Sequence, residues 1–280
     1  MSNSDFNVLT SLSAGADVAH AEPSYRPSLR LLSYNIQSGI ASRRYHHYVT
    51  HSWKHVLPDS QRIGNLNRIA GLLRNFDLIG LQEVDGGSLR SGFINQTEYL
   101  ALKAHFPHWY DQTNRNLGLI AQHSIGLLSR LKPTEINEHK LPGIIPGRGS
   151  LSVSYGDTDD ALLLLIVHFA LGRRARLQQI LYVGELVRSY RHAILMGDFN
   201  FQSGSEEMDL LLAVTGLREP TPGLHTFPSW RPYRNIDHIL VSSSLQVKSV
   251  RTLDYPFSDH LPIAMEVILP QELAELSAAA

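Results

Sequence analysis

The chain has 280 residues, of which 43% are hydrophobic and 18% are charged, so it can bury a full core as one large domain or two small ones. Its formal net charge of -1 gives no overall attraction to nucleic acid or to an anionic membrane, so a polyanionic substrate would need a local basic patch. The absence of cysteine excludes disulfides, thiolate zinc sites and thiol nucleophiles.

The two ends of the chain differ in composition from the rest. Residues 1–27 are small, polar and punctuated by proline, which predicts a flexible N-terminal tail. They lack the charged and apolar regions of a signal peptide, and no stretch approaches the roughly 20 apolar residues of a membrane span. Residues 271–280 form a predicted C-terminal tail, in which Leu273–Ala280 favour helix and are expected to fray. Residues 28–270 contain no linker or repeat, so we expect one domain in a soluble, cytoplasmic protein with no transmembrane segment.

Between the tails, hydrophobic periodicity predicts alternating strands and helices. A first strand over Leu29–Ile36 precedes a helix over Arg62–Arg74, which has Asp59 or Ser60 available as its N-cap. The other predicted helices are Arg174–Tyr190 and Glu206–Thr215. The other predicted strands are Phe76–Val84, Ile125–Ser129, Leu151–Tyr155 (half-exposed), Ala161–Phe169, Ala193–Met196, His238–Ser242 and Ile263–Leu269. Some strands follow one another with no room for a crossover helix, so a mixed sheet, or two sheets with helices outside, fits better than a parallel barrel.

Polar clusters stand at the ends of four apolar runs and in two further segments. They are Leu31–Asn35, Leu78–Asp85, Leu162–His168, Ala193–Asn200, Asn235–Ile239 and Phe257–Pro262. These clusters are rich in Asp, Glu, Asn and His, which are the residue types that bind hard cations and move protons. Together they predict a single phosphoryl-transfer site built around a hard metal ion.

Two of these clusters contain the candidate acids. Glu83 at a strand end can provide oxygen ligands to Mg²⁺, although an ordinary acid at the start of a loop is an equal alternative. Asp85 ranks below it. Asp198 and Asn200 flank Phe199, so both are expected to face one way and to orient a water or hold a phosphate oxygen. The alternative is an Asx-turn at the strand end.

Histidine follows aspartate in two of the clusters. Because neighbours on a strand point to opposite faces, Asp237 is a better partner for His260 than Asp259 is, and Asp259 then faces the metal. For His238 we favour a packed structural role.

A third histidine, His168, ends the most apolar run, beside Arg173, Arg174 and Arg176 at the start of a helix that would itself suit an anion. At least one of these arginines is expected to be solvated. Arg173 is predicted to bind substrate phosphate, as are Arg115 and Arg148 from glycine-rich loops. The histidine-rich run Tyr45–His55 matches no tight set of metal ligands, and a surface loop near the substrate is the better interpretation.

In their chain order the motifs SYNI, LQEVD, HFALGRRAR, GDFN, IDHI and SDHLP resemble the endonuclease/exonuclease/phosphatase superfamily over about residues 29–268. The resemblance implies an α/β (α+β), deoxyribonuclease-I-like four-layer sandwich, in which two packed mixed β-sheets are flanked by helices. It also implies roles for individual residues. Glu83 is the principal Mg²⁺ ligand, with Asn35 and Asp259 nearby, and Mn²⁺ can substitute. Asp198 activates water, Asn200 holds the phosphate, His168 bonds the phosphoryl oxygens, and His260, steadied by Asp237, stabilises the transition state.

The implied activity is Mg²⁺-dependent hydrolysis of a phosphodiester. Nucleic acid, a phospholipid head group and an inositol phosphate all remain open as the substrate, and no protein partner can be inferred. Trp230, Arg231 and Tyr233 are as consistent with a head-group or base pocket as with loop packing. A phosphomonoesterase is the nearest alternative. An inactive phosphate-binding scaffold is a more distant one, because no residue of the site is missing.

Overall fold

The computed structural model describes residues 27–39, 60–116, 122–143, 147–156 and 160–278. Its strands are β1 (Ser28–Asn35), β2 (Leu78–Asp85), β3 (His108–Asn116), β4 (Gln122–Ser129), β5 (Glu135–Lys140), β6 (Gly149–Tyr155), β7 (Leu162–His168), β8 (His192–Asp198), β9 (Asp237–Val241), β10 (Gln246–Thr252) and β11 (Ile263–Ile268). Its helices are α2 (Ser60–Leu73), α3 (Gln96–Ala104), α4 (Arg173–Val187), α5 (Glu206–Thr215) and α6 (Ala274–Ala278), with 3-10 turns η1 (Gln37–Gly39), η3 (Leu89–Ser91) and η4 (Gln271–Leu273). The predicted histidine-rich loop Tyr45–His55 and most of the predicted N-terminal tail lie outside the described residues.

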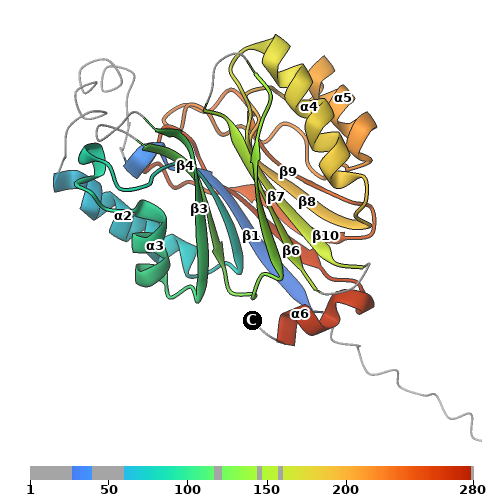
Figure 1. Ribbon diagram of the computed structural model, residues 1–280, viewed down its shortest axis with the longest axis horizontal. Helices are drawn as coiled ribbons and strands as arrows, with labels where there is room; N and C mark the ends of the chain where they lie inside the picture. The colour runs from blue at the N-terminus through green and yellow to red at the C-terminus, as the bar shows by residue number, and fades with distance from the viewer. Residues whose placement is uncertain (1–26, 40–59, 117–121, 144–146, 157–159, 279–280) are drawn as a thin grey trace, which may run out of the picture.

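Two sheets lie face to face, and helices cover their outer faces (Figure 1). One sheet has the strand order β10-β11-β1-β2-β4-β3 and the other has the order β5-β6-β7-β8-β9. Both sheets are mixed, because β1 and β2 run parallel, as do β7 and β8, while the other pairs are antiparallel. This arrangement confirms the four-layer sandwich that the sequence implied.

Three clusters of buried apolar side chains hold the four layers together. The cluster between the sheets includes Leu164 and Met196. A second cluster packs α2 and α3 on the six-stranded sheet, and a third packs α4 and α5 on the five-stranded sheet. Strands β7 and β8 are therefore covered on both faces, which explains why their sequences are continuous apolar runs.

The two parallel pairs determine where the polar strand ends come together. Helix α2 connects β1 to β2 and helix α4 connects β7 to β8, so the carboxyl ends within each pair lie at one edge of a sheet. The register pairs His168 with Asp198 directly, and Asn35 with Gln82. Polar residues that follow these apolar runs are thereby gathered at one end of the sandwich.

The structure corrects the prediction for Leu151–Tyr155. The alternation of serine with apolar residues suggested a half-exposed strand, but β6 is buried along its whole length. Within the predicted range, Ser152 bonds to His139 of β5 at 2.8 Å, and Ser154 bonds to Tyr190, which follows α4, at 3.2 Å. The hydroxyls of Ser152 and Ser154 are paired inside the protein, so the alternation does not mark a solvent face.

The C-terminal segment packs more closely than its predicted fraying suggested. Helix forms over Ala274–Ala278, as the composition indicated, and the preceding turn η4 contains Leu273. The side chain of Leu273 is 3% exposed and joins the cluster between the sheets, with Leu276 packed against that cluster. This segment therefore closes the end of the sandwich opposite the polar strand ends (Figure 1).

Gly197 allows β7 and β8 to approach closely just before the polar ends. Its φ is +150°, and a Cβ atom there would lie 1.9 Å from the carbonyl oxygen of Val167. We expect Gly197→Ala to lower the free energy of unfolding by about 2–5 kcal/mol, because backbone strain and overpacking add together. Chemical denaturation monitored by circular dichroism measures this change.

Gly71 provides a matched control for that substitution. It lies on an exposed part of α2, where a Cβ atom added to it would have nothing within 4 Å and where φ is ordinary for a helix. Gly71→Ala should leave stability unchanged or raise it by up to about 1 kcal/mol. Equal stability of the two variants would show that the close contact at Gly197 has no energetic weight.

Candidate active site

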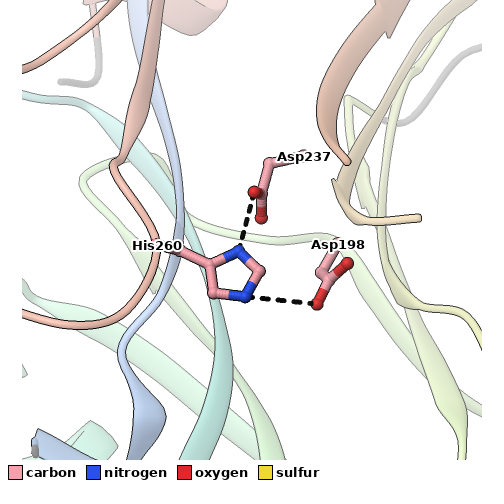
Figure 2. A group of neighbouring side chains, drawn as sticks. All are labelled: Asp198, Asp237 and His260. Carbon is pink, nitrogen blue, oxygen red and sulfur yellow. Dashed lines mark hydrogen bonds and ion pairs between the residues drawn. The ribbon is translucent and has the colours of Figure 1, made fainter. Parts of the chain in front are cut away.

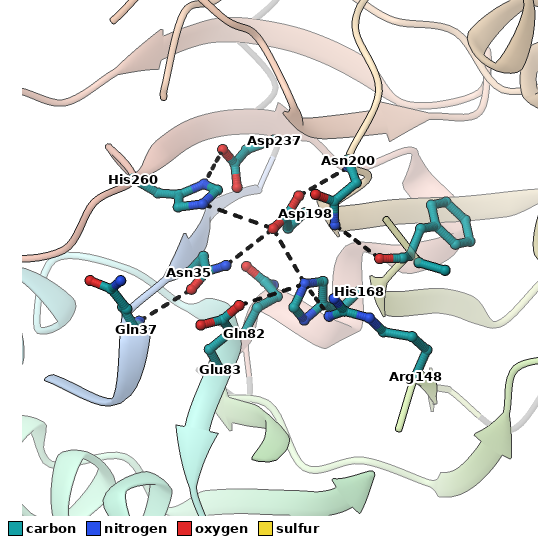
Figure 3. A network of polar contacts seen from close by, with 12 residues as sticks. Asn35, Gln37, Gln82, Glu83, Arg148, His168, Asp198, Asn200, Asp237 and His260 are labelled. Carbon is teal, nitrogen blue, oxygen red and sulfur yellow. Dashed lines mark hydrogen bonds and ion pairs between the residues drawn. The ribbon is translucent and has the colours of Figure 1, made fainter. Parts of the chain in front are cut away.

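Side chains from both sheets meet at the carboxyl ends of β1, β2, β7 and β8 (Figure 3). Asn35, the last residue of β1, donates a hydrogen bond from Nδ2 to Oδ2 of Asp198, the last residue of β8, at 3.1 Å. Both residues are almost completely buried, with 1% and 2% exposure. This bond joins the two sheets at the point where the sequence predicted one site.

Asp198 is surrounded by positively charged or hydrogen-bonding groups. His168 Nε2 lies 3.4 Å from Asp198 Oδ2, and His260 Nε2 lies 4.0 Å from the same oxygen. Burial alone would raise the pKa of the Asp198 carboxyl, but the hydrogen bond from His168, together with neighbouring positive charges, holds that pKa well below its usual value. Asp198 is therefore a carboxylate at neutral pH, able to accept a hydrogen bond from a water molecule.

The residues after Asp198 fix its orientation. Asn200 has φ +58°, a conformation that asparagine tolerates, and its backbone N–H donates to Asp198 Oδ1 at 3.0 Å. Its Nδ2 also donates to the carbonyl of Phe169 at 2.9 Å. The Phe199 ring is fully buried against Phe169 and Phe201. The Asx-turn alternative is thus realised, and the turn itself positions the carboxylate to which the site hypothesis gives the water.

His260 forms the pair that the sequence predicted with Asp237. His260 Nδ1 donates to Asp237 Oδ2 at 2.8 Å, which turns Nε2 towards Asp198 (Figure 2). Burial alone would lower the pKa of His260, but the charge and hydrogen bond of Asp237 raise it well above 6.5. The raised pKa favours the protonated form of His260, whose Nε2 is directed into the site.

The pair of His260 and Asp237 is held in place by two residues that were not assigned to the site from the sequence. Thr226 is fully buried, and its hydroxyl donates to Asp237 Oδ2 at 2.5 Å. The ring of Phe227 packs against the imidazole of His260, with centroids 4.9 Å apart. Both belong to the TFPSWRPY segment, for which the sequence suggested only a substrate contact or loop packing.

His238, in the other Asp-His pair, has the structural role that the sequence favoured. It is 3% exposed, and its two ring nitrogens contact Glu219 Oε1 at 2.8 Å and the carbonyl oxygen of Phe201 at 2.9 Å. Its ring also packs near those of Phe199 and Phe201. It is thus committed to the layer beneath the site.

A bulge in β2 gives Glu83 and Asp85 different surroundings. The register with β4 shifts between Leu81 and Val84, and Glu83 adopts φ +56°. Glu83 keeps 31% of its side chain exposed, with Oε1 3.9 Å from His168 Nε2. Asp85 is fully buried and accepts hydrogen bonds from the backbone N–H of Gly87 and from Ser88 and Ser91. The ranking of Glu83 above Asp85 agrees with this geometry, because Asp85 organises the following loop.

The donor atoms near Glu83 fit a hard divalent cation. Burial raises the pKa of Asp259 to about 6, and the negative charge of Glu83 adds to that increase. Two carboxylates that repel each other in this way are stabilised by a cation between them. Asn35 adds an amide oxygen, and Gln82 carries a buried Oε1 with no hydrogen-bond partner among the described residues. An oxygen-only donor set of this kind suits Mg²⁺ or Mn²⁺.

A second group of possible ligands is better explained without a metal. Single donor atoms of Asp198, Asp237 and His260 all lie within 4.8 Å of one another. However, the hydrogen bond between His260 Nδ1 and Asp237 already uses the nitrogen that faces Asp237 (Figure 2). We interpret these three residues as a hydrogen-bonded group that keeps a proton on His260. The carboxylates that suit a cation, those of Glu83 and Asp259, are separate from it.

The structure distributes the three predicted substrate-binding arginines differently. Arg148 reaches the site, where its Nη1 lies beside Nε2 of His168. Arg115 has its backbone in β3, but its side chain lies outside the described residues. Arg173 pairs with Glu206 and Glu207 of α5 and is not among the described residues that line the cavity beside the site. Arg174 lines that cavity instead.

Comparisons with known proteins agree with this geometry. The family model described as "Endonuclease/Exonuclease/phosphatase family" matches residues 32–260. Among curated proteins, none matches the sequence significantly. In the described residues, no helix has the length and apolar character needed to cross a membrane.

Several solved structures share the fold. An endonuclease/exonuclease/phosphatase family protein from Bacteroides thetaiotaomicron has 20% identity and a TM-score of 0.66, with 88% of this chain and 100% of that chain covered. A mannosyl-6-phosphatase from Bacteroides thetaiotaomicron VPI-5482 has 20% identity and a TM-score of 0.62 over 86% and 100%. The human Nocturnin catalytic domain with bound sulfate has 15% identity and a TM-score of 0.64 over 88% and 96%. Likenesses at this level of identity establish the fold and leave the activity to be argued from the site.

Proposed function

Because this chain belongs to the endonuclease/exonuclease/phosphatase family, we propose that it is a hydrolase of phosphate esters, with a phosphodiester as the first candidate substrate and Mg²⁺ as the cofactor. The observation that carries the proposal is the meeting of both sheets at Asp198. Asn35 contacts its carboxylate from one sheet, and His168 contacts it from the other. This arrangement supplies an anion that can orient water and polar groups that can contact phosphate.

Asp198 and Asn200 would hold the attacking water. The Asp198 carboxylate accepts a hydrogen bond from the water and directs its lone pair towards phosphorus. The carboxamide of Asn200 is held beside it through the carbonyl of Phe169, ready to contact the water or a phosphate oxygen. Holding the nucleophile in line with the breaking bond removes much of the entropic barrier to reaction.

His168 and His260 would act on the phosphate from two sides. His168, beside Arg148, is placed to hydrogen-bond the non-bridging oxygens. The imidazolium of His260 carries a proton on Nε2, which it can donate to an oxygen on which negative charge develops. Asp237 keeps Nδ1 protonated, so Nε2 remains the donor to the substrate.

Glu83, with Asp259 and Asn35, would hold the cation. When bound there, Mg²⁺ or Mn²⁺ would neutralise charge on the phosphate and stabilise the departing oxygen. The oxygen-only donor set and the mutual repulsion of the two carboxylates support this assignment.

A phosphomonoesterase is the second candidate. Arg148 beside His168 provides a second positive group, which a dianionic phosphate monoester needs more than a diester does. One of the similar structures is a mannosyl-6-phosphatase. An inactive phosphate-binding scaffold is less consistent with the chain, because every residue assigned to the chemistry is present.

Hydrolysis of a matched pair of aryl esters tests the proposal. We expect the purified protein with Mg²⁺ to release nitrophenol from bis-p-nitrophenyl phosphate, and EDTA to stop the release. The ratio of this rate to that on p-nitrophenyl phosphate distinguishes diester from monoester preference. A panel of DNA, RNA, phospholipid and inositol phosphate then identifies the natural class. The proposal would be contradicted if the protein hydrolysed none of these compounds in the presence of Mg²⁺ or Mn²⁺.

A further inference from the structure

A cavity of about 590 Å³ extends from the candidate active site along the first turns of α4. Glu83 and His168 line its inner end, and Leu171, Arg174 and Gln178 line the wall formed by α4 and the turn before it. A volume of this size suits a small organic molecule or the end of a chain, and is too small for a nucleic acid duplex. The cavity can therefore contain the part of a substrate that extends beyond the reacting phosphate.

The three arginines at the start of α4 have different partners. Arg173 pairs with Glu206, and Arg176 donates to Glu207 at 2.7 Å. Among the described residues, Arg174 has no hydrogen-bond or ion-pair partner. The dipole of a helix disfavours a positive charge in its first turn. The carboxylates of α5 offset this unfavourable interaction for Arg173 and Arg176 but not for Arg174. The remaining charge, that of Arg174, is left facing the cavity.

The wall between His168 and Arg174 is largely apolar. Ala170, Leu171 and Ala175 line it, and Leu171 is 75% exposed although it is a large hydrophobic residue. An exposed leucine between a catalytic histidine and an unpaired guanidinium suits a ligand with a carbon skeleton and a charge at its far end. Such a ligand would place one phosphate at His168 and a second anionic group at Arg174.

We propose that Arg174 recognises a second anionic group, so that this site prefers phosphate esters that carry a further phosphate on the organic part of the molecule. The inference rests on the proposed hydrolysis of phosphate esters and assigns its substrate class. The second phosphate can come from a nucleotide chain or from a phosphorylated sugar, and the shared chemistry is an anion beyond a short carbon skeleton. Arginine suits this role because its planar guanidinium donates two parallel hydrogen bonds to phosphate.

Two matched substrate pairs test the role of Arg174. The dinucleotides pApA and ApA differ only in a terminal phosphate, as do fructose 1,6-bisphosphate and fructose 6-phosphate. For the wild-type protein with Mg²⁺, we expect a higher kcat/KM for the member of at least one pair that carries the extra phosphate. Arg174→Ala should reduce that preference by at least about tenfold, and Arg174→Lys should restore part of it, because lysine retains the charge without the planar fork.

Arg188 provides the control on the same helix. It caps the far end of α4 and pairs with Glu185, so Arg188→Ala should keep the wild-type preference. Equal losses of kcat/KM on both members of a pair in Arg174→Ala, or no loss on either, would overturn the inference while leaving the hydrolase proposal intact.

Calorimetric binding of the same four compounds separates the two proposals. If the wild-type protein hydrolyses neither these compounds nor the aryl esters and the substrate panel, but binds the doubly phosphorylated members more tightly in an Arg174-dependent way, the hydrolase proposal fails and the anion site stands. If that hydrolysis is absent and no Arg174-dependent binding is found, both proposals fail. The pair that shows the effect identifies the source of the second phosphate.

Discussion

Asp198→Asn is expected to lower kcat for phosphate ester hydrolysis by at least about a hundredfold without unfolding the protein. The amide has the same shape, and its oxygen can still accept the hydrogen bond that Asn200 donates to this position at 3.0 Å. The negative charge that orients and polarises the water is lost. Steady-state kinetics on bis-p-nitrophenyl phosphate, with circular dichroism to confirm folding, measures the effect.

An acid outside the site provides the comparison for this variant. Asp209 lies in the first turn of α5 with an exposed side chain, so Asp209→Asn removes one negative charge at a distance from the chemistry. This control should keep kcat within a factor of about two, as expected for a substitution of an exposed surface residue. A folded Asp198→Asn protein that retains the full rate would remove Asp198 from the mechanism.

His260→Gln is the second substitution with a large expected effect. We predict a loss of kcat of at least about a hundredfold, because the imidazolium that faces the developing charge is replaced by a neutral amide. His238→Gln is the matched control, since His238 follows an aspartate in the same way but contacts Glu219 and the carbonyl of Phe201 away from the site. Equal losses of kcat in the folded fractions of both variants would contradict the assignment.

The pH dependence of the rate provides a separate test of the same residue. The pKa of His260 is raised well above 6.5, so activity that needs its proton is present at neutral pH and declines as the pH rises through that folded-state pKa. Asp237→Asn removes the charge that raises this pKa, and the alkaline limb of the profile should therefore move to lower pH. An unchanged alkaline limb in Asp237→Asn would show that a different group controls it.

The position of the site could be predicted from the sequence because it depends on a simple property of parallel strands. Asn35, His168 and Asp198 each end an apolar run, and strands connected by a crossover helix end at one edge of a sheet. The partner of His260 was predicted correctly as Asp237, although residues 257–260 form a bend and not the strand on which that prediction was based.

Three of the four edge strands could not be predicted in this way, whereas the fourth, β9, is buried along its length and was predicted. Strands β3, β5 and β10 lie at the edges of their sheets, and β5 and β10 carry mostly exposed or half-exposed polar side chains. Edge strands are often polar because this prevents further pairing, so a polar edge strand has no hydrophobic signal.

Helix α3 was missed as well, although its sequence carries a capping signal that hydrophobic periodicity does not detect. Asn95 caps this helix by accepting hydrogen bonds from the backbone N–H groups of Thr97 and Glu98.

Side-chain pairing across the chain was the other limit. Arg173 and Arg174 are neighbours in sequence, and only the position of α5 shows that Glu206 and Glu207 engage the first and leave the second. Thr226 likewise has no local feature that indicates its bond to Asp237. Such contacts depend on how separate elements pack, which one sequence does not reveal.

The response of hydrolysis to added Mg²⁺, compared between the wild-type protein and Glu83→Gln, tests the central claim most directly. After treatment with EDTA, the wild-type protein should be inactive and should recover its full rate as Mg²⁺ is added. Glu83→Gln should need at least about ten times more Mg²⁺ for half-maximal rate, because a neutral amide replaces the charged ligand. Full activity of the metal-free wild-type protein, or the same Mg²⁺ curve for both proteins, would contradict a divalent-cation phosphoesterase site at Glu83.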